Sequence, residues 1–246
     1  MKLNTIIQGD CLEVMKDIPD KSIDMILCDL PYGTTACSWD TIIPFEPLWE
    51  QYKRIIKDNR AIVLTASQPF TTDLINSNRK WLKYELIWDK VRATQPHLSK
   101  IQPMKRHENI IIFGKDKILY NPQLVLKDNP RKSTGSYGSK DNEHKLGIGK
   151  KRMKEYLITH SYPTTILKKS NASNKGRVHP TQKPVALFEY LIKTYTNEND
   201  LVLDNCLGSG TTAVACQNIK RNFIGIEISK EYCSISNKRL AQKPLL

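Results

Sequence analysis

The sequence predicts an α/β fold built on a doubly wound, mostly parallel sheet that carries one inserted segment. Short apolar runs alternate with amphipathic stretches along residues 1–113, and the same alternation returns over residues 179–246. Strands that alternate with helices form parallel βαβ units, which place helices on both faces of one sheet. A polar, basic stretch over residues 114–178 interrupts this pattern. We therefore expect one core domain formed by both ends of the chain.

The first half of the chain shows strand and helix patterns in turn. Residues 61–66 (AIVLTA) are an apolar run of the length that buried strands have. Residues 45–57 place Leu48, Tyr52 and Ile55 at helical spacing. The elements expected here, in order, are strand 5–8, helix 11–16, strand 23–28, helix 45–57, strand 61–66, helix 71–76, strand 84–88 and strand 108–113.

Regular patterning resumes near the end of the chain. Residues 184–195 predict an amphipathic helix, with Leu187, Tyr190 and Leu191 on its inward face. The elements expected after it are strand 201–204, helix 210–219, strand 222–226 leading to Glu227, and helix 231–240.

Positive charge is concentrated in and around the insertion. The chain has 38 basic and 25 acidic residues, a net charge of +13, and residues 114–183 hold 16 of the basic residues and 5 of the acidic ones. Such a surplus favours a polyanionic partner, nucleic acid first and an anionic membrane second. A structureless stretch of this length is unusual in a compact domain unless it is functional. We therefore interpret residues 114–178 as a segment that contacts the substrate.

Several protein classes fit the sequence poorly. No window approaches the ~18 apolar residues of a membrane span, and the first ten residues lack the apolar run of a signal peptide. We expect a cytoplasmic protein without a membrane partner. The six cysteines form no CxxC pair and no zinc spacing, and His107-Glu108 lacks the second His of an HExxH motif because Ile111 stands there. No metal site is predicted.

The segment that follows the 201–204 strand has the outline of a nucleotide-cofactor site. Asp204 leads into Gly208-Ser209-Gly210-Thr211, a helix follows, and Glu227 ends the next strand. Glycines allow a tight turn and a close approach of the backbone to a ligand, and the helix N-terminus offers N–H groups to a carboxylate. A carboxylate about twenty residues further on can accept the ribose hydroxyl protons. NAD fits this motif too, since its GxGxxG pattern tolerates Ala213 at the third glycine.

A second motif, Asp29-Leu30-Pro31-Tyr32-Gly33, directly follows the 23–28 strand. Residues just past the carboxyl ends of parallel strands line the ligand crevice of such a sheet. Asp29 can accept a hydrogen bond from an amino group, a neighbouring backbone carbonyl can accept a second one, and Tyr32 can stack on a planar ring. Two acceptors favour the tetrahedral amino nitrogen that must attack a methyl group. This context favours a methyl donor over NAD.

Taken together, these motifs resemble those of the amino-methylating DNA methyltransferases, and their order resembles the β group. That group places its Asp-Pro-Pro-Tyr motif first, the target-recognition region next and the S-adenosylmethionine motif last. The matching segments here are DLPY at 29–32, the basic insertion, HPTQKP at 179–184 and DNCLGSGTT at 204–212. Further similarity lies in GDCL at 9–12, IWDK at 87–90 and RHEN at 106–109. Residues 1–113 and 179–246 would form the catalytic and cofactor halves of one core.

The resemblance implies roles for particular residues. Asp29, the Leu30 backbone, Pro31 and Tyr32 would hold a flipped base, with Asp29 central to catalysis. Asp10 would contact the adenine of S-adenosyl-L-methionine and Glu227 its ribose. The remaining predicted cofactor residues, which would lie around the methionine part or open the motif, are Lys183, Asp204, Gly208, Ser209, Gly210 and Thr211. Leu30 stands where the group usually has Pro, and Asn205-Cys206 where it usually has Pro-Phe.

The expected activity is methyl transfer to adenine N6 in double-stranded DNA. Cytosine C5 methylation is disfavoured because it needs a nucleophilic Cys, usually in a Pro-Cys pair, and no Pro here precedes a Cys. An Asp at the first motif position favours adenine N6, and Ser there favours cytosine N4. Three alternatives stay open: cytosine N4, an RNA or small-molecule acceptor, and a catalytically silent DNA-binding protein of this fold. Members of the group are often dimers, so a homodimer is compatible with the resemblance.

Overall fold

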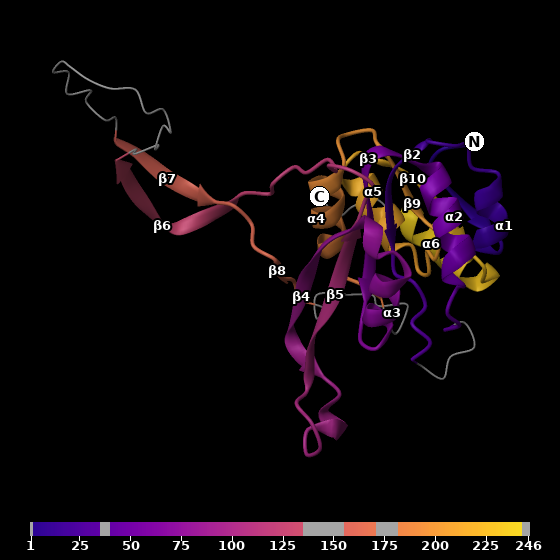
Figure 1. Cartoon of the computed structure of the whole chain (residues 1–246), viewed down its shortest axis with the longest axis horizontal. Coiled ribbons are helices and arrows are strands. Elements are labelled where there is room, and N and C mark those ends of the chain that lie inside the picture. The colour runs from indigo at the N-terminus through magenta and orange to yellow at the C-terminus, as the bar shows by residue number, and fades with distance from the viewer. Residues whose placement is uncertain (1, 35–39, 135–154, 171–181, 243–246) are drawn as a thin grey trace. The chain divides into compact units, whose positions relative to one another are not determined.

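The computed structural model describes residues 2–34, 40–134, 155–170 and 182–242. The chain divides into two compact units (Figure 1). The larger unit comprises Met1–Asn121 and Thr165–Leu246, and the smaller one comprises Pro122–Thr164. The ends of the chain therefore form one core, and an insertion separates them in the sequence. None of the helices in the described part of the chain is long and apolar enough to span a membrane.

The larger unit is built on a mixed sheet that is mostly parallel. Among the described residues its eight strands lie in the order β1-β10-β9-β2-β3-β5-β4-β8. All neighbours are parallel except β5, which runs antiparallel to both β3 and β4. The strands are β1 (Thr5–Gln8), β2 (Ile23–Cys28), β3 (Ile56–Ala66), β4 (Leu82–Thr94), β5 (Lys105–Phe113), β8 (Ile166–Lys168), β9 (Leu201–Asp204) and β10 (Asn222–Glu227).

Helices cover both faces of this sheet, as a doubly wound fold requires (Figure 1). Side chains of α1, α2 and α3 pack on one face, and those of α4 and α5 pack on the other. The last helix, α6, contacts α5, β1 and β10. The helices are α1 (Cys11–Lys16), α2 (Phe45–Ile55), α3 (Phe70–Ser77), α4 (Val185–Tyr195), α5 (Thr211–Asn218) and α6 (Lys230–Ala241).

Strand β2 shows how the sequence fills both layers. Its side chains point alternately to the two faces, so Ile26 and Cys28 join the core under α1 and α2. Met25 and Leu27 join the core under α4 and α5. A strand buried on both faces is apolar throughout rather than alternating, which is why this segment could be recognised as a central strand.

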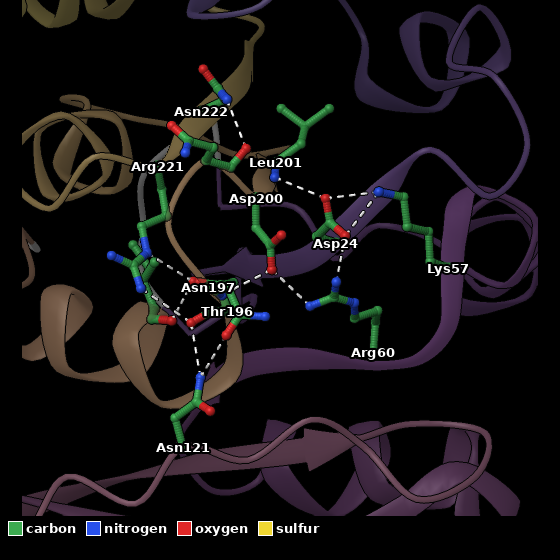
Figure 2. Close-up of polar contacts among 12 residues, drawn as sticks. Asp24, Lys57, Arg60, Asn121, Thr196, Asn197, Asp200, Leu201, Arg221 and Asn222 are labelled. Carbon is green, nitrogen blue, oxygen red and sulfur yellow. Dashed lines mark hydrogen bonds and ion pairs between the residues drawn. The ribbon is translucent and has the colours of Figure 1, made fainter.

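A network of charged side chains closes the amino end of the parallel strands (Figure 2). Asp24, near the start of β2, is buried, and its carboxylate lies 2.9 Å from the side-chain nitrogens of Lys57 and Arg60 on β3. It also accepts the Leu201 N–H at 3.0 Å, and Arg60 lies 2.7 Å from Asp200. The network ties β2, β3 and β9 together at the end of the sheet away from residue 29.

The smaller unit contains an antiparallel pair, β6 (Val125–Thr134) and β7 (Glu155–Ser161). The sequence pattern predicted neither strand, nor β8, because β6 and β7 carry many polar residues and β8 spans only three residues. Residues 114–121 and β8 lie in the larger unit. For example, Asn121 donates its backbone N–H to Thr194 at 2.7 Å, and β8 pairs with β4.

Candidate active site

One cavity of about 790 Å³ collects nearly all the residues that the sequence singles out. It lies where the parallel strands β1, β2, β3, β9 and β10 end. Gly210, whose position the structure also describes, is the single predicted site residue outside the lining. The predicted residues in the lining are Asp10, Asp29, Leu30, Pro31, Tyr32, Lys183, Asp204, Gly208, Ser209, Thr211 and Glu227. The two motifs, far apart in sequence, therefore open into the same space.

The glycine loop between β9 and α5 needs its glycines for two different reasons. Gly208 has φ +54°, which favours glycine, and a Cβ there would meet nothing within 4 Å. Gly210 has φ +85°, and a Cβ there would lie 2.9 Å from the Cβ of Ser236 on α6. Gly210 thus shapes the turn and lets α6 pack, while Gly208 leaves open space at the cavity wall.

Carboxylates stand at the ends of three strands around this loop. Glu227 accepts the backbone N–H of Gly208 at 2.7 Å through one oxygen and that of Ser229 at 2.8 Å through the other. Asp10 caps α1 by accepting the N–H groups of Leu12 and Glu13. A carboxylate has about four acceptor directions, so both groups retain capacity to accept ligand hydroxyl or amino protons.

Asp204 is fixed inside the loop. Its carboxylate accepts the Thr212 hydroxyl and the Cys206 backbone N–H, and the residue is 2% exposed. Burial raises the pKa of Asp204 to about 7, against the lowering effect of its hydrogen bonds. Its geometry ties the start of the loop to the first turn of α5.

Two side chains that motif reasoning missed, one aliphatic and one aromatic, complete this end of the cavity. Ile228 and Tyr232 line it, and Ile228 is 64% exposed although it is a large aliphatic residue. An exposed aliphatic side chain next to the Glu227 carboxylate suits a purine nucleoside, whose base is apolar on its faces and whose ribose bears hydroxyls. The open space at Gly208 and the N-terminus of α5 suit the carboxylate-bearing chain of an amino acid. This end of the cavity therefore fits S-adenosyl-L-methionine.

Asp29 lies at the other end and is held by groups from three segments. Its Oδ1 accepts the Tyr32 hydroxyl at 2.8 Å and the hydroxyl of Thr65, at the end of β3. Its Oδ2 lies 2.7 Å from Nζ of Lys183, just before α4. The two acceptor directions of Oδ1 are thus occupied, whereas Oδ2 keeps one for a substrate.

Tyr32 has more contacts inside the protein than its motif suggested. Its ring stacks on Phe70 with centroids 5.2 Å apart, and Lys183 Nζ lies 5.7 Å from its ring centroid. Burial and the neighbouring Asp29 raise the pKa of Tyr32 well above its usual value, so its hydroxyl remains a donor. Stacking of Tyr32 on a substrate ring stays a prediction.

Asp40 holds the DLPYG loop in shape, a role that no motif indicated. Its Oδ1 accepts the backbone N–H groups of Tyr32 at 2.7 Å and Gly33 at 2.9 Å, and its Oδ2 accepts that of Thr34 at 2.9 Å. Leu30, in the same loop, is 3% exposed and packs into the core. Buried packing thus restrains the position where the usual proline is missing.

The antiparallel direction of β5 brings further polar groups to the cavity. Because β5 runs against its neighbours, its first residues lie at the edge where the parallel strands end. Lys105 and Glu108 from β5, Trp88 and Lys90 from β4, and Ser67 after β3 all line the cavity. The IWDK and RHEN segments, which contain Trp88, Lys90 and Glu108, were recognised in the sequence by their resemblance to the family, but the sequence did not show that they lie near Asp29. His179, in the HPTQKP segment, lies outside the described residues.

The cysteines near the cavity are poor nucleophiles. A hydrogen bond with Cys206 and burial raise the pKa of Cys11 well above its usual range, and burial raises the pKa of Cys28 to about 12. Both thiols therefore stay protonated near neutral pH. This agrees with the absence of a Pro-Cys pair and disfavours covalent attack on a cytosine ring.

Comparison with known proteins agrees with the family resemblance of the motifs. A family model described as DNA methylase, of the N6 and N4 type, matches residues 23–238. The Type II methyltransferase M.HinfI of Haemophilus influenzae is 28% identical over an alignment of 269 residues. The alignment covers 98% of this chain and 69% of that protein. The M1.HpyAVI–SAM complex is 26% identical with a TM-score of 0.65, and covers 97% of this chain and 99% of that one.

The PvuII DNA methyltransferase, described as cytosine-N4-specific, supports the fold. It has a TM-score of 0.68 at 18% identity, and the match covers 98% of this chain and 88% of that one. The family model covers most of the chain, including both ends of the cavity. The chain therefore belongs to the DNA methylase family of N6 and N4 methyltransferases, which use S-adenosyl-L-methionine as the methyl donor.

Proposed function

We propose that this enzyme is a site-specific methyltransferase that modifies adenine N6 in double-stranded DNA. The observation that carries the proposal is the shared cavity, in which Asp29 and Tyr32 face the same space as the Gly208 loop. Several relatives, among them M.HinfI and M.HpaI, are Type II methyltransferases by name, which supports a site-specific role beside a restriction enzyme.

The proposed reaction needs an adenine turned out of the duplex into the cavity. The free acceptor direction of Asp29 Oδ2 accepts a hydrogen bond from one N–H of the amino group, and the Leu30 carbonyl accepts one from the other N–H. Bound S-adenosyl-L-methionine supplies a sulfonium methyl group, whose C–S electron pair stays on sulfur when the nitrogen bonds to carbon. The methylated nitrogen then loses a proton to Asp29 or to solvent. Positioning supplies most of the rate gain.

In this proposal the amino-group acceptors take the place of a covalent catalyst. The amino lone pair is delocalised into the ring, so attack requires a nitrogen drawn toward tetrahedral geometry. Acceptors aimed at both N–H bonds stabilise that geometry as positive charge develops. Cytosine N4 has the same requirement and is the second candidate, since the family includes both activities. Asp rather than Ser at position 29 favours adenine.

Duplex contacts are proposed for the basic insertion. Residues 114–183 hold 16 basic and 5 acidic residues, a surplus suited to phosphates. We propose that the segment over 114–178 reads the target site. A homodimer is compatible with this reaction.

Product identification tests the proposal. Purified protein is incubated with duplex DNA and methyl-labelled S-adenosyl-L-methionine, and the DNA is digested to nucleosides for mass spectrometry. The expected product is N6-methyl-2′-deoxyadenosine. Labelled N4-methylcytosine would transfer the assignment to the second candidate, and preferential labelling of RNA would replace the DNA substrate. Absence of any labelled base would favour a silent DNA-binding protein.

A further inference from the structure

Four charged side chains form a row of contacts at the base-binding end of the cavity. Lys90 Nζ lies 2.5 Å from Glu108 Oε1, and Lys183 Nζ lies 3.4 Å from Glu108 Oε2. Lys183 continues the row to Asp29 Oδ2, at 2.7 Å. Glu108 thus stands between two lysines, and one of them touches the carboxylate proposed to hold the target amino group.

Both lysines are buried, and this makes the carboxylate between them necessary. The side chains of Lys90 and Lys183 are 9% and 8% exposed. Buried ammonium groups are costly unless they are paired, and two of them close together also repel each other. Glu108 lies against both, so it compensates both charges and allows Lys183 to remain beside Asp29.

The contact between Glu108 and Lys183 is ionic rather than a hydrogen bond. Within the described residues, the buried Oε2 atom of Glu108 has no hydrogen-bond partner. The other oxygen is held by Lys90, which in turn lies 5.5 Å from the ring centroid of Trp88. The carboxylate is therefore anchored through Lys90 and presents its second oxygen to Lys183.

The balance of charges keeps Lys183 a cation. Burial alone would lower the pKa of Lys183, but the carboxylates of Asp29 and Glu108 outweigh burial and raise it. Lys105, bonded to the Ser67 hydroxyl, also faces this group, and burial lowers its pKa. Three lysines and two carboxylates, together with the Tyr32 hydroxyl, thus determine the field at the target amino group.

We infer that Glu108 is a positioning residue, which fixes the Lys183 ammonium on Oδ2 of Asp29 so that one acceptor direction stays aimed at the target amino group. The inference rests on the proposed function and assigns a role to a residue outside both motifs. Without the Glu108 charge, Lys183 loses one of its two carboxylate partners, and the orientation of Asp29 is no longer fixed from that side. Binding of S-adenosyl-L-methionine at the Gly208 end should not depend on Glu108.

The first test replaces Glu108 by Gln in the full chain, which removes the charge and keeps the shape. We expect kcat to fall about tenfold or more, the scale of losing one charge-assisted hydrogen bond, here the one from Lys183 to Asp29. The KM for DNA and the affinity for S-adenosyl-L-methionine should stay within about threefold, well below that effect. The alkaline limb of kcat should move to lower pH, because Lys183 loses one of the carboxylates that raise its pKa.

The matched control is Asp89→Asn, one residue along β4 from the Trp88 position that pairs with Glu108. Asp89 forms an ion pair with Arg106, whose side chain is 55% exposed, and Asp89 does not line the cavity. Its kcat and pH profile should match the wild type. A residue that merely stabilises the sheet would lower the melting temperature without moving the alkaline limb.

A double-mutant cycle shows whether Glu108 acts through Lys183. In a Lys183→Met background, Glu108→Gln should change kcat by less than about twofold, because the group it positions is gone. Fully additive effects would overturn the inference. If Glu108→Gln does not fold, Glu108→Asp is measured instead; a lowered kcat with the same direction of pH shift supports the inference, and wild-type values overturn it.

The failure of this inference can be told apart from that of the proposed function. Wild-type protein that methylates no amino group contradicts both. If the wild type is active and Asp29→Ala is inactive, the proposed function stands. A Glu108→Gln variant whose kcat and alkaline limb are unchanged would then overturn only the role of Glu108.

Discussion

At the scale of single residues, the site depends on how one carboxylate is held. Asp29 receives donors from its own loop, from the end of β3 and from the residue just before α4. These donors occupy three of its roughly four acceptor directions. The proposed reaction therefore depends on the placement of Tyr32, Thr65 and Lys183 as much as on Asp29.

Tyr32→Phe isolates the contribution of one donor. The variant keeps the ring that stacks on Phe70 and loses the hydroxyl that donates to Asp29 Oδ1 at 2.8 Å. We expect kcat to fall about tenfold, as for a hydrogen bond to a charged group, with unchanged cofactor affinity. Single-turnover methylation measures it. The control is Tyr84→Phe, which removes a hydroxyl that is hydrogen-bonded to the Tyr195 hydroxyl. Equal effects of the two variants would contradict the role of Tyr32.

The raised pKa of Asp204 predicts that the free energy of unfolding depends on pH. Its folded-state pKa is about 7 against an ordinary value of 3.8, so the folded chain holds a proton that the unfolded chain releases between these values. This group therefore makes the free energy of unfolding fall as pH rises from about 4 to about 7. Asp204→Asn lacks this pH-dependent component. The free energy of unfolding of the variant, relative to the wild type, should therefore rise between about pH 4 and pH 7 and stay constant above that range. Urea unfolding at several pH values measures the difference, and a pH-independent difference would refute the assignment.

The site residues that could be predicted from sequence are those within contiguous motifs. Asp29 and Glu227 follow strands and belong to recognisable patterns, so their place at the cavity was expected. Asp40, Thr65 and Glu108 act on those motifs from other segments, and only the folded chain shows which loop each one reaches. Lys183 was expected near the methionine part of the cofactor, and the structure places it on Asp29.

At the scale of elements, the direction of β5 decides which residues reach the cavity. A parallel strand in its place would put Lys105 and Glu108 at the far end of the sheet. The sequence predicted the strand over 108–113 but not its direction, because periodicity carries no information about pairing. The strand expected over 84–88 corresponds to β4, which extends further, to Thr94. The strand expected over 108–113 corresponds to β5, which begins earlier, at Lys105. Those extensions are polar and lack the apolar signal of buried strands.

Asp24→Asn tests the network at the opposite edge of the sheet (Figure 2). The substitution removes a buried charge that faces Lys57 and Arg60, so we expect a loss of about 2 kcal/mol in the free energy of unfolding, reduced from a fully buried pair because Lys57 is partly exposed. The kcat of the folded variant should not change. Asp58→Asn, at the exposed pair with Lys21, is the control and should cost much less. An equal loss in both variants would rule out a special role for the Asp24 network.

At the scale of the whole molecule, the order of the motifs along the chain determines how the core is assembled. The DLPY motif precedes the insertion and the glycine-loop motif follows it, yet both lie in one unit because the two ends of the chain share the sheet. Alternating strands and helices made this architecture predictable. The strands β6 and β7 were not predictable, since strands rich in charged and polar residues differ little from loops in sequence, and β8 is too short at three residues to show a pattern.

The basic insertion carries the prediction for DNA affinity. Combined alanine substitution of Lys127, Arg131 and Lys132 on β6 should weaken binding to duplex DNA and reduce the slope of log affinity against log salt by about 0.9 for each phosphate that the variant no longer neutralises. Titrations at several salt concentrations measure both quantities. Alanine at the exposed Lys193, Lys220 and Lys238 removes the same charge from the larger unit. Equal loss of affinity and slope in the two triple variants would show that the insertion has no special role.

The central claim is that one cavity holds the methyl donor at the Gly208 loop and the target amino group at Asp29. The most direct test measures methyl transfer to DNA and affinity for S-adenosyl-L-methionine in the same Asp29→Ala preparation. The account predicts loss of methyl transfer with cofactor affinity within a few-fold of the wild type. Methyl transfer at the wild-type rate by this variant would contradict it.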